Sequence, residues 1–283
     1  MLSRVVQPKK IDADTLTYKQ DKESLELHQF TYGITSDPLI QFSVAISALI
    51  HDTDHPGVPN SQLVKEESGL ALLYKNKSVA EQNSVDLAWE LLMEDGFKDL
   101  RNCIYTTQDE LDRFRQLIVN SVMATDIVDK ELGAARKSRW NKAFAEDGDE
   151  RDITEKQKIQ RKATIVIEHM VQAADVSHMM QHWHVYIKWN EKFFRECYKA
   201  YLTGRAEKDP SEGWYNGELG FYKFYVIPLA KKLETCGVFG VSSDEFLNYA
   251  EANYREWELK GEEMVARYLE NFNRDKASGK LII

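Results

Sequence analysis

The segment HDTDHPG at residues 51–57 has the clearest capacity for chemistry, because two histidines and two aspartates fall close together in it. Imidazole nitrogen suits zinc and iron, whereas carboxylate oxygen suits hard divalent cations. His51 can therefore bind one ion while Asp52 bridges that ion to a second, and such a pair of ions can activate water and hold a phosphoryl group. The alternative is a polar helix end whose Asp54 and His55 are solvated.

A further aspartate, Asp175, ends the apolar run TIVIEHMVQAAD of residues 164–175. An unpaired charge is costly to bury, so this carboxylate must be paired, capped or bound to a metal. Taken alone, a plain aspartate at the C-terminal end of a helix explains it equally well.

Helical patterns dominate the elements that must position these residues. Residues 38–51 follow Asp37-Pro38, which is a cap followed by a first-turn proline. Other helical patterns cover 78–95, 108–124, 155–174, 182–203, 219–234, 243–252 and 254–272. The polar stretches 144–155 and 204–217 are expected to be loops. Strict alternation of apolar and polar residues, which is typical of β-strands, is rare. The sequence therefore predicts an all-α protein.

The composition restricts the classes of partner. The net charge of −9 over 283 residues argues against nucleic acid and against membrane surfaces, both of which need clustered Lys and Arg. The longest apolar stretch, residues 42–50, is far shorter than the roughly 20 residues of a membrane span. The three cysteines have no CxxC spacing, which is typical of reduced thiols in the cytoplasm.

Five segments, in this order, resemble motifs of the class I 3',5'-cyclic nucleotide phosphodiesterases. They are HDTDHPGVPN (51–60), LALLYKNKSVAEQN (70–83), ATD (124–126), QAADVS (172–177) and GELGFYKFYVIPL (217–229). The resemblance implies a compact multi-helix, HD-type catalytic domain over residues 38–272. Residues 1–37 would be an N-terminal remnant or insert, partly loop, and residues 273–283 a frayed tail.

The resemblance also implies a role for each matching residue. His51, Asp52 and Asp175 would be metal ligands, with Asp52 bridging both ions, and His55 would orient a catalytic water. Three further residues would hydrogen-bond waters around the second metal: Glu81, Thr125 and Asp126. For Glu81, capping of its helix is an alternative.

Four residues would form the nucleotide pocket. Glu218 would face the edge of the base, Phe221 would stack on the base, and Trp189 would line the back. His178 stands where the family usually has asparagine, and with His182 and His184 it could instead lie on the surface or the pocket rim. The alternative for Trp189 and Phe221 is packing in an aromatic core.

The sequence departs from the family at several places. The family motif HNxxHxxD, which supplies a proton donor and a metal histidine, is absent from residues 1–50. We therefore expect the chain to start inside a longer phosphodiesterase, with His28 a weak substitute ligand. Glu218 also replaces the glutamine with which the family reads purines.

The implied function is hydrolysis of 3',5'-cyclic nucleotides, cGMP or cAMP, in signal transduction, using two divalent ions, zinc with magnesium or manganese. The alternatives are a catalytically impaired fragment that binds nucleotide or regulates a partner, and another HD-type metal phosphohydrolase. The chain would be cytoplasmic, or the cytosolic part of a longer membrane protein. It could be fused to upstream regulatory or cyclase domains.

Overall fold

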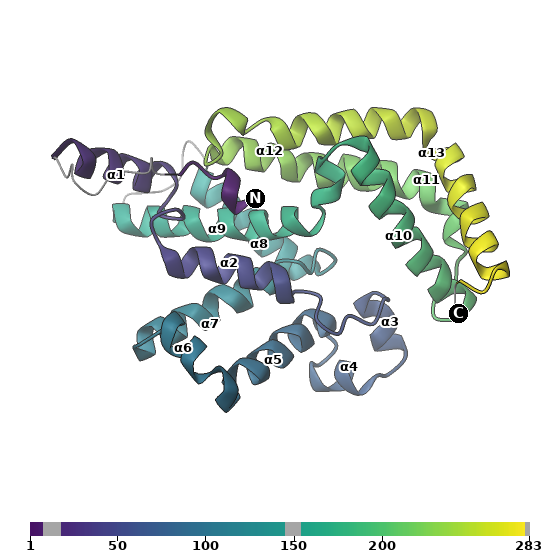
Figure 1. The fold of residues 1–283 in the computed structure, drawn as a ribbon, viewed down its shortest axis with the longest axis horizontal. Coiled ribbons are helices and arrows are strands. Elements are labelled where there is room, and N and C mark those ends of the chain that lie inside the picture. The colour runs from purple at the N-terminus through teal and green to yellow at the C-terminus, as the bar shows by residue number, and fades with distance from the viewer. Residues whose placement is uncertain (8–17, 145–153, 281–283) are drawn as a thin grey trace. The chain divides into compact units, whose positions relative to one another are not determined.

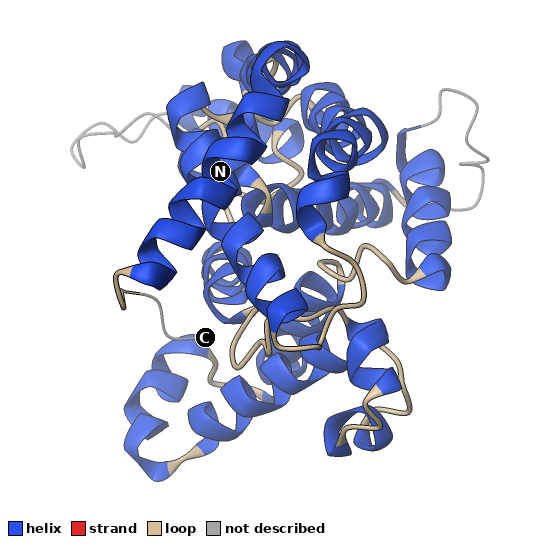
Figure 2. Cartoon of the chain, turned by 90° about the vertical axis from the view of Figure 1, so that its right-hand side faces the viewer, coloured by secondary structure: helices blue, strands red, loops and turns tan. Residues whose placement is uncertain are grey.

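Helices form all the regular structure in the computed structural model, which describes residues 1–7, 18–144 and 154–280 (Figure 2). No strand occurs in these ranges, so the prediction of an all-α protein is confirmed. The chain divides into two compact units. The first comprises Met1–Asp54, Ala80–Asp175 and Leu233–Ser243, and the second comprises His55–Val79, Val176–Lys232 and Asp244–Ile283.

The first unit is built around α2 (Pro38–Ile50), which packs against α7 (Gln108–Met123) and α9 (Glu155–Asp175). Its other helices, labelled in Figure 1, are α1 (Tyr18–Phe30), α5 (Val79–Met93), α6 (Lys98–Ile104) and α8 (Lys130–Phe144). The carboxylate of Asp37 accepts hydrogen bonds from the backbone N–H groups of Leu39 and Ile40, as the sequence predicts. This cap fixes where α2 begins, and α2 in turn carries the HD motif at its C-terminal end.

The second unit holds α3 (Asn60–Lys65), α4 (Gly69–Leu73), α10 (Trp183–Leu202), α11 (Pro210–Phe221) and α13 (Glu245–Ala277). The last three pack against one another, side by side in Figure 1. Their core is aromatic: the side chains of Tyr186, Phe194, Tyr222, Trp257 and Tyr268 are fully buried. Helix α12 (Ile227–Cys236) begins in this unit and ends in the first.

One element prediction is wrong in part, and two predicted helical regions are helical but divided differently. The expected loop 204–217 already contains the start of α11, where Asp209 caps the backbone N–H of Ser211 and Pro210 opens the helix. The expected helix 219–234 is interrupted by a π-helical turn, Tyr222–Val226. Residues 243–252 and 254–272 form one helix, which continues through residues 273–277 of the expected frayed tail.

An ion pair supports this continuation, because Arg195 Nη1 lies 2.8 Å from the Asp275 carboxylate. Residues 145–153, part of the other expected loop, lie outside the described residues, as do 8–17 and 281–283. Residues 1–37 were expected to be partly loop, and Tyr18–Phe30 of them are helical. No described helix combines the length and apolar character that a membrane crossing requires.

Candidate functional site

His51 follows α2 directly, and its ring is fixed by the helix itself. The Nδ1 atom of His51 lies 3.0 Å from the carbonyl oxygen of Ala48, one turn earlier. We assign the proton of Nδ1 to this hydrogen bond, because a carbonyl can only accept. The other nitrogen, Nε2, is then directed away from α2 and is available to bind a cation.

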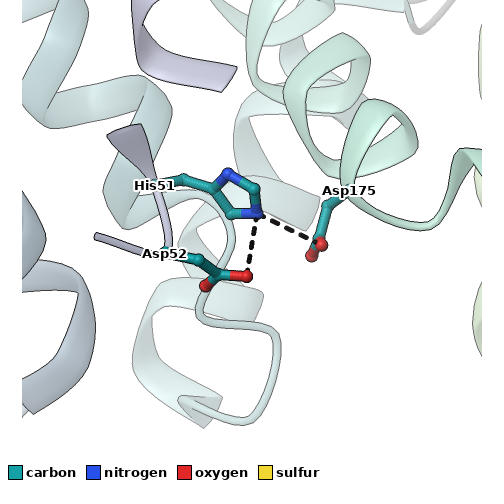
Figure 3. Close-up of side chains that lie close together, drawn as sticks. All are labelled: His51, Asp52 and Asp175. Atoms are coloured by element: carbon teal, nitrogen blue, oxygen red, sulfur yellow. Dashed lines mark hydrogen bonds and ion pairs between the residues drawn. The ribbon is translucent and has the colours of Figure 1, made fainter. Parts of the chain in front are cut away.

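Two carboxylates meet this nitrogen. Asp52 Oδ2 and Asp175 Oδ1 each lie 3.3 Å from His51 Nε2 (Figure 3). Asp52 comes from the end of α2 and Asp175 from the end of α9, and these two helices pack together. The three side chains are the one group in the described part of the chain whose donor atoms are close enough to share an ion.

The electrostatics of the group favour a cation. Hydrogen bonds to Asp175 first and to Asp52 second raise the pKa of His51 to about 10, against the opposing effect of burial. A proton on Nε2 therefore balances the two carboxylates when no other cation is present. One imidazole nitrogen with two carboxylate oxygens is a donor set that suits zinc, manganese or iron. The Asp52 side chain is 62% exposed, so it remains accessible to a second ligand.

The structure assigns local partners to the residues expected around a second ion. Thr125 Oγ1 donates to the carbonyl of Val122. Asp126 is buried, and its Oδ1 accepts the backbone N–H groups of Val128 and Asp129. Glu81 is half-buried in the first turn of α5. Their contacts with metal-bound water stay predictions.

Two polar contacts that the sequence did not predict steady the same region of the first unit. Ser84 Oγ donates to the carbonyl of Thr53 at 2.9 Å, and Gln172 Nε2 donates to the carbonyl of Ala124 at 2.8 Å. Gln172 lies in an otherwise apolar buried run, and a polar residue in such a run must find a partner. The presence of Gln172 in this run was therefore the one sequence signal that could have indicated a polar contact here.

His55 belongs to the second unit, where its Nδ1 accepts the backbone N–H of Gly57 at 3.2 Å. The turn that follows α2 includes positive φ angles at Asp54 (59°) and Gly57 (70°). Glycine adopts such angles freely, whereas aspartate adopts them less often. The expected role of His55 in orienting water stays a prediction.

Glu218, on α11 of the second unit, is a buried carboxyl held by two neighbours. Tyr186 Oη donates to Glu218 Oε2 at 2.8 Å. Burial raises the pKa of Glu218 to about 7, although hydrogen bonds from Tyr186 and Asn190 oppose this shift. Asn190 is oriented in turn by Trp214, whose Nε1 donates to the Asn190 Oδ1 at 3.1 Å.

The other expected pocket residues lie in the same unit. The His178 ring is nearly parallel to the Tyr186 ring, with centroids 6.5 Å apart. Phe221 follows Glu218 on α11 and stacks against Tyr225 at 5.0 Å. Trp189 is 48% exposed, with Lys192 Nζ 4.2 Å from its ring centroid, so it does not pack in the core of this unit.

Three other histidines have protein partners. The rings of His182 and His184 stack with centroids 5.8 Å apart, and the Tyr249 hydroxyl lies 3.0 Å from His182 Nε2. In the first unit, His28 Nδ1 lies 2.5 Å from Ser36 Oγ. Neither arrangement brings together the three donor groups that define the candidate metal site.

Comparisons with known proteins identify relatives of this chain. Residues 23–238 match the family model described as 3'5'-cyclic nucleotide phosphodiesterase. The dual specificity calcium/calmodulin-dependent 3',5'-cyclic nucleotide phosphodiesterase 1C of Mus musculus is 29% identical over 159 residues, covering 55% of this chain and 20% of its own length. The probable 3',5'-cyclic phosphodiesterase pde-3 of Caenorhabditis elegans is 24% identical over 225 residues, covering 75% of this chain and 31% of its own length.

A solved structure supports the fold. The phosphodiesterase domain of Salpingoeca rosetta rhodopsin phosphodiesterase superposes with a TM-score of 0.67 at 24% sequence identity, covering 87% of this chain and 75% of that chain. The chain thus shares the helical fold of that domain. It spans only a fifth to a third of the length of the curated relatives given above.

Proposed function

Because the chain belongs to the 3',5'-cyclic nucleotide phosphodiesterase family, we propose that it hydrolyses 3',5'-cyclic nucleotides to nucleoside 5'-monophosphates. The reaction adds water across the bond between phosphorus and the 3' oxygen. An oxygen must attack phosphorus, and a proton must reach the leaving 3' oxygen. Residues 1–50 lack the HNxxHxxD motif that supplies this proton in the family, so in this chain the proton would come from water. The observation that carries the proposal is the convergence of His51, Asp52 and Asp175 on one point.

These three residues would hold the divalent ions, zinc with magnesium or manganese. Such ions supply a water of lowered pKa and neutralise charge on phosphoryl oxygens. The Nδ1–H of His51, bound to the Ala48 carbonyl, keeps Nε2 oriented for binding. Asp52 is the more exposed carboxylate, which supports its role as the bridge between two ions. His55, Glu81, Thr125 and Asp126 would order water around them.

The residues proposed to recognise the base lie in the second unit. Phe221 would stack on the base, and Trp189 and His178 would line the pocket. Glu218 would read the edge of the base. An ionised carboxylate only accepts hydrogen bonds, and guanine presents two adjacent donors, whereas adenine presents a donor beside an acceptor. Ionised Glu218 therefore favours cyclic GMP, and this preference depends on a pKa of about 7.

We propose that the chain works in the cytoplasm, as part of cyclic-nucleotide signalling. Its three cysteines are free thiols, one exposed, one half-buried and one buried, which supports a reducing compartment. The structural relative is described as a domain of a rhodopsin phosphodiesterase, which supports fusion to regulatory domains in a longer parent protein.

The test is a hydrolysis assay on the purified protein with Zn²⁺, Mg²⁺ and Mn²⁺, following release of 5'-AMP and 5'-GMP. Asp52→Asn keeps the size of the side chain but removes its charge, and we expect at least about a 100-fold lower kcat/KM, because metal activation of water supplies much of the rate. The matched control is Asp99→Asn on α6, where the aspartate is exposed and outside the candidate metal group.

Activity that persists in Asp52→Asn at the control level would overturn the assignment of the metal group. Release of 3'-monophosphates in place of 5'-monophosphates would overturn the proposed bond cleavage. Metal-stimulated release of 5'-monophosphates, lost in Asp52→Asn and kept in Asp99→Asn, is the expected result.

A further inference from the structure

A hollow lies between α8 and α9 of the first unit, two helices that pack together (Figure 1). Its volume is about 530 Å³, and it is lined by Arg139 and Lys142 of α8 and by Gln157, Gln160, Arg161 and Thr164 of α9. The Arg, Lys and Gln side chains that line it carry N–H donors, the Thr164 hydroxyl donates to the carbonyl of Gln160, and none of the described lining residues is acidic. The hollow therefore presents a concave set of donors with positive charge.

The spacing of these residues follows from helix geometry. The α9 residues fall at i, i+3, i+4 and i+7, so they form a single stripe along that helix. Arg139 and Lys142 stand at i and i+3 on α8, so they also share a face. Lys142 borders a second hollow of about 520 Å³ together with Lys137, Ser138 and Asn141. The donor surface thus extends across α8.

Arg139 is positioned by a buried acid. Its Nη2 donates to Glu168 Oε2 at 2.6 Å, and the Glu168 side chain is only 5% exposed. This carboxylate fixes the guanidinium at the hollow, and a guanidinium has five N–H donors, so others remain for a ligand. Lys142 and Arg161 are exposed, so their charges can meet an ion from solvent.

The charge of the two helices that line the hollow contrasts with that of the whole chain. The net charge of the protein is −9, yet Lys and Arg outnumber Asp and Glu in both α8 and α9. Cations gathered in a concave surface attract anions more strongly than the same cations dispersed over a flat one. The negative net charge of the chain opposes nucleic acid, whose recognition needs an extended basic face.

We propose that this hollow binds a small polyanion carrying several phosphate groups, of the kind found in inositol polyphosphates and in phosphoinositide headgroups. Arginine pairs with phosphate through two parallel N–H bonds, and lysine and amide donors take the remaining oxygens. The volume falls within the range of small-ligand sites. The ligand is distinct from the proposed substrate, because none of the lining residues that the structure describes is aromatic, so they offer a base no ring to stack on.

The site is separate from the candidate metal group. Thr164 lies on the same helix as Asp175, and the rise of an α-helix puts about 16 Å between them along the axis. Binding at the hollow can therefore be measured without reference to hydrolysis, and its failure leaves the proposed function untouched.

The experiment is calorimetric titration of the full 283-residue chain with inositol 1,4,5-trisphosphate, at low and at physiological salt. We expect saturable binding that weakens with salt. Lys142→Gln with Arg161→Gln should weaken binding at least about tenfold, since hydrogen bonds to charged groups are the stronger ones. The control removes two exposed positive charges outside the hollow, Lys98→Gln with Lys208→Gln, and should change the affinity less than about twofold.

Vesicle sedimentation distinguishes the two sources of the ligand. If the protein sediments with vesicles of phosphatidylcholine and phosphatidylinositol 4,5-bisphosphate but not with pure phosphatidylcholine vesicles, that result supports a lipid headgroup as the ligand. Binding of the soluble trisphosphate alone supports a free ligand. The proposal is overturned if neither binds, or if the control pair of substitutions weakens binding as much as the pair in the hollow. Circular dichroism of each variant confirms that the helices are intact.

Discussion

Asp175 Oδ1 lies 3.3 Å from His51 Nε2, although 124 positions separate the two residues in the chain. The contact exists because α2 and α9 pack against each other. Helix α9 ends at Asp175, and α2 ends one residue before His51. Each carboxylate of the group meets the same nitrogen, but Asp52 is more exposed than Asp175. This asymmetry leads to the first prediction.

Asp52→Ala should weaken metal binding more than Asp175→Ala, because a bridging carboxylate serves two ions and a terminal one serves a single ion. Loss even of an outer-shell partner typically costs about 10–100-fold in metal affinity, so we expect a loss of at least about 100-fold for Asp52→Ala. Metal content after dialysis against zinc, measured by mass spectrometry, checks this. Equal losses in both variants, or full retention in Asp52→Ala, would contradict the bridging role.

The parts of this site that could be predicted from sequence are those with local signals. Asp37-Pro38 predicts the start of α2, and the HD motif at its end indicates a metal ligand from the local sequence alone. Asp209-Pro210 carried the same signal for α11, but it lay in a polar stretch that was interpreted as a loop. The π-helical turn Tyr222–Val226 gives no such local signal.

Contacts between helices that are distant in the chain could not be predicted from the sequence. The hydrogen bond from Tyr186 to Glu218 depends on how α10 and α11 pack, and neither helix shows its partner in its own pattern. The pairing of Asp175 with His51 was expected only from family resemblance, since burial alone allowed a cap or an ion pair equally well. Packing of distant segments decides which polar groups meet.

The Glu218 carboxyl should make stability fall as pH rises. Its pKa is raised from 4.5 to about 7 by burial, so between these values the folded state binds more protons than the unfolded state. Stability therefore decreases as pH rises through this window, by an amount on the order of 3 kcal/mol. Chemical denaturation at pH 5 and pH 8 should show this dependence in the wild type and a smaller one in Glu218→Gln. An identical pH dependence in both proteins would refute the shifted pKa.

The same titration should govern the choice of base. Below pH 7 a protonated Glu218 both donates and accepts, as an amide does, whereas above pH 7 it only accepts. The ratio of kcat/KM for cyclic GMP to that for cyclic AMP should therefore rise between pH 6 and pH 8, by up to about tenfold if one hydrogen bond decides it. Glu218→Gln should give a ratio independent of pH. A ratio that does not change in the wild type would remove Glu218 from base recognition.

Tyr186→Phe should destabilise the protein by about 1–3 kcal/mol at pH 8, because it leaves a buried, ionised carboxylate without one of its two side-chain donors. At pH 5 the cost should be smaller, since a protonated Glu218 demands less from its partners. Tyr201→Phe is the matched control on the same helix, where the ring is half-buried. Urea denaturation of the three proteins at both pH values checks this. A cost that is the same at pH 5 and pH 8 would show that the hydroxyl matters only for packing.

Two helical glycines in the second unit allow the effect of helix propensity to be separated from the effect of close packing. A Cβ at Gly261 of α13 would lie 2.7 Å from ring atoms of both Trp257 and Tyr215, whereas a Cβ at Gly213 of α11 would meet nothing within 4 Å. Alanine is favoured over glycine in a helix by roughly 1 kcal/mol, so Gly213→Ala should stabilise the protein by about 0.5–1 kcal/mol.

Gly261→Ala gains the same propensity but forces the buried Trp257 ring to shift, and overpacking typically costs about 1–3 kcal/mol. We therefore expect a lower melting temperature for Gly261→Ala and a higher one for Gly213→Ala, measured by calorimetry under one condition. Trp257 also donates from its Nε1 to the carbonyl of Tyr215 at 3.1 Å, so a displaced ring would strain this hydrogen bond as well. If Gly261→Ala is as stable as Gly213→Ala, the close packing of α13 against α11 does not disfavour a Cβ at position 261.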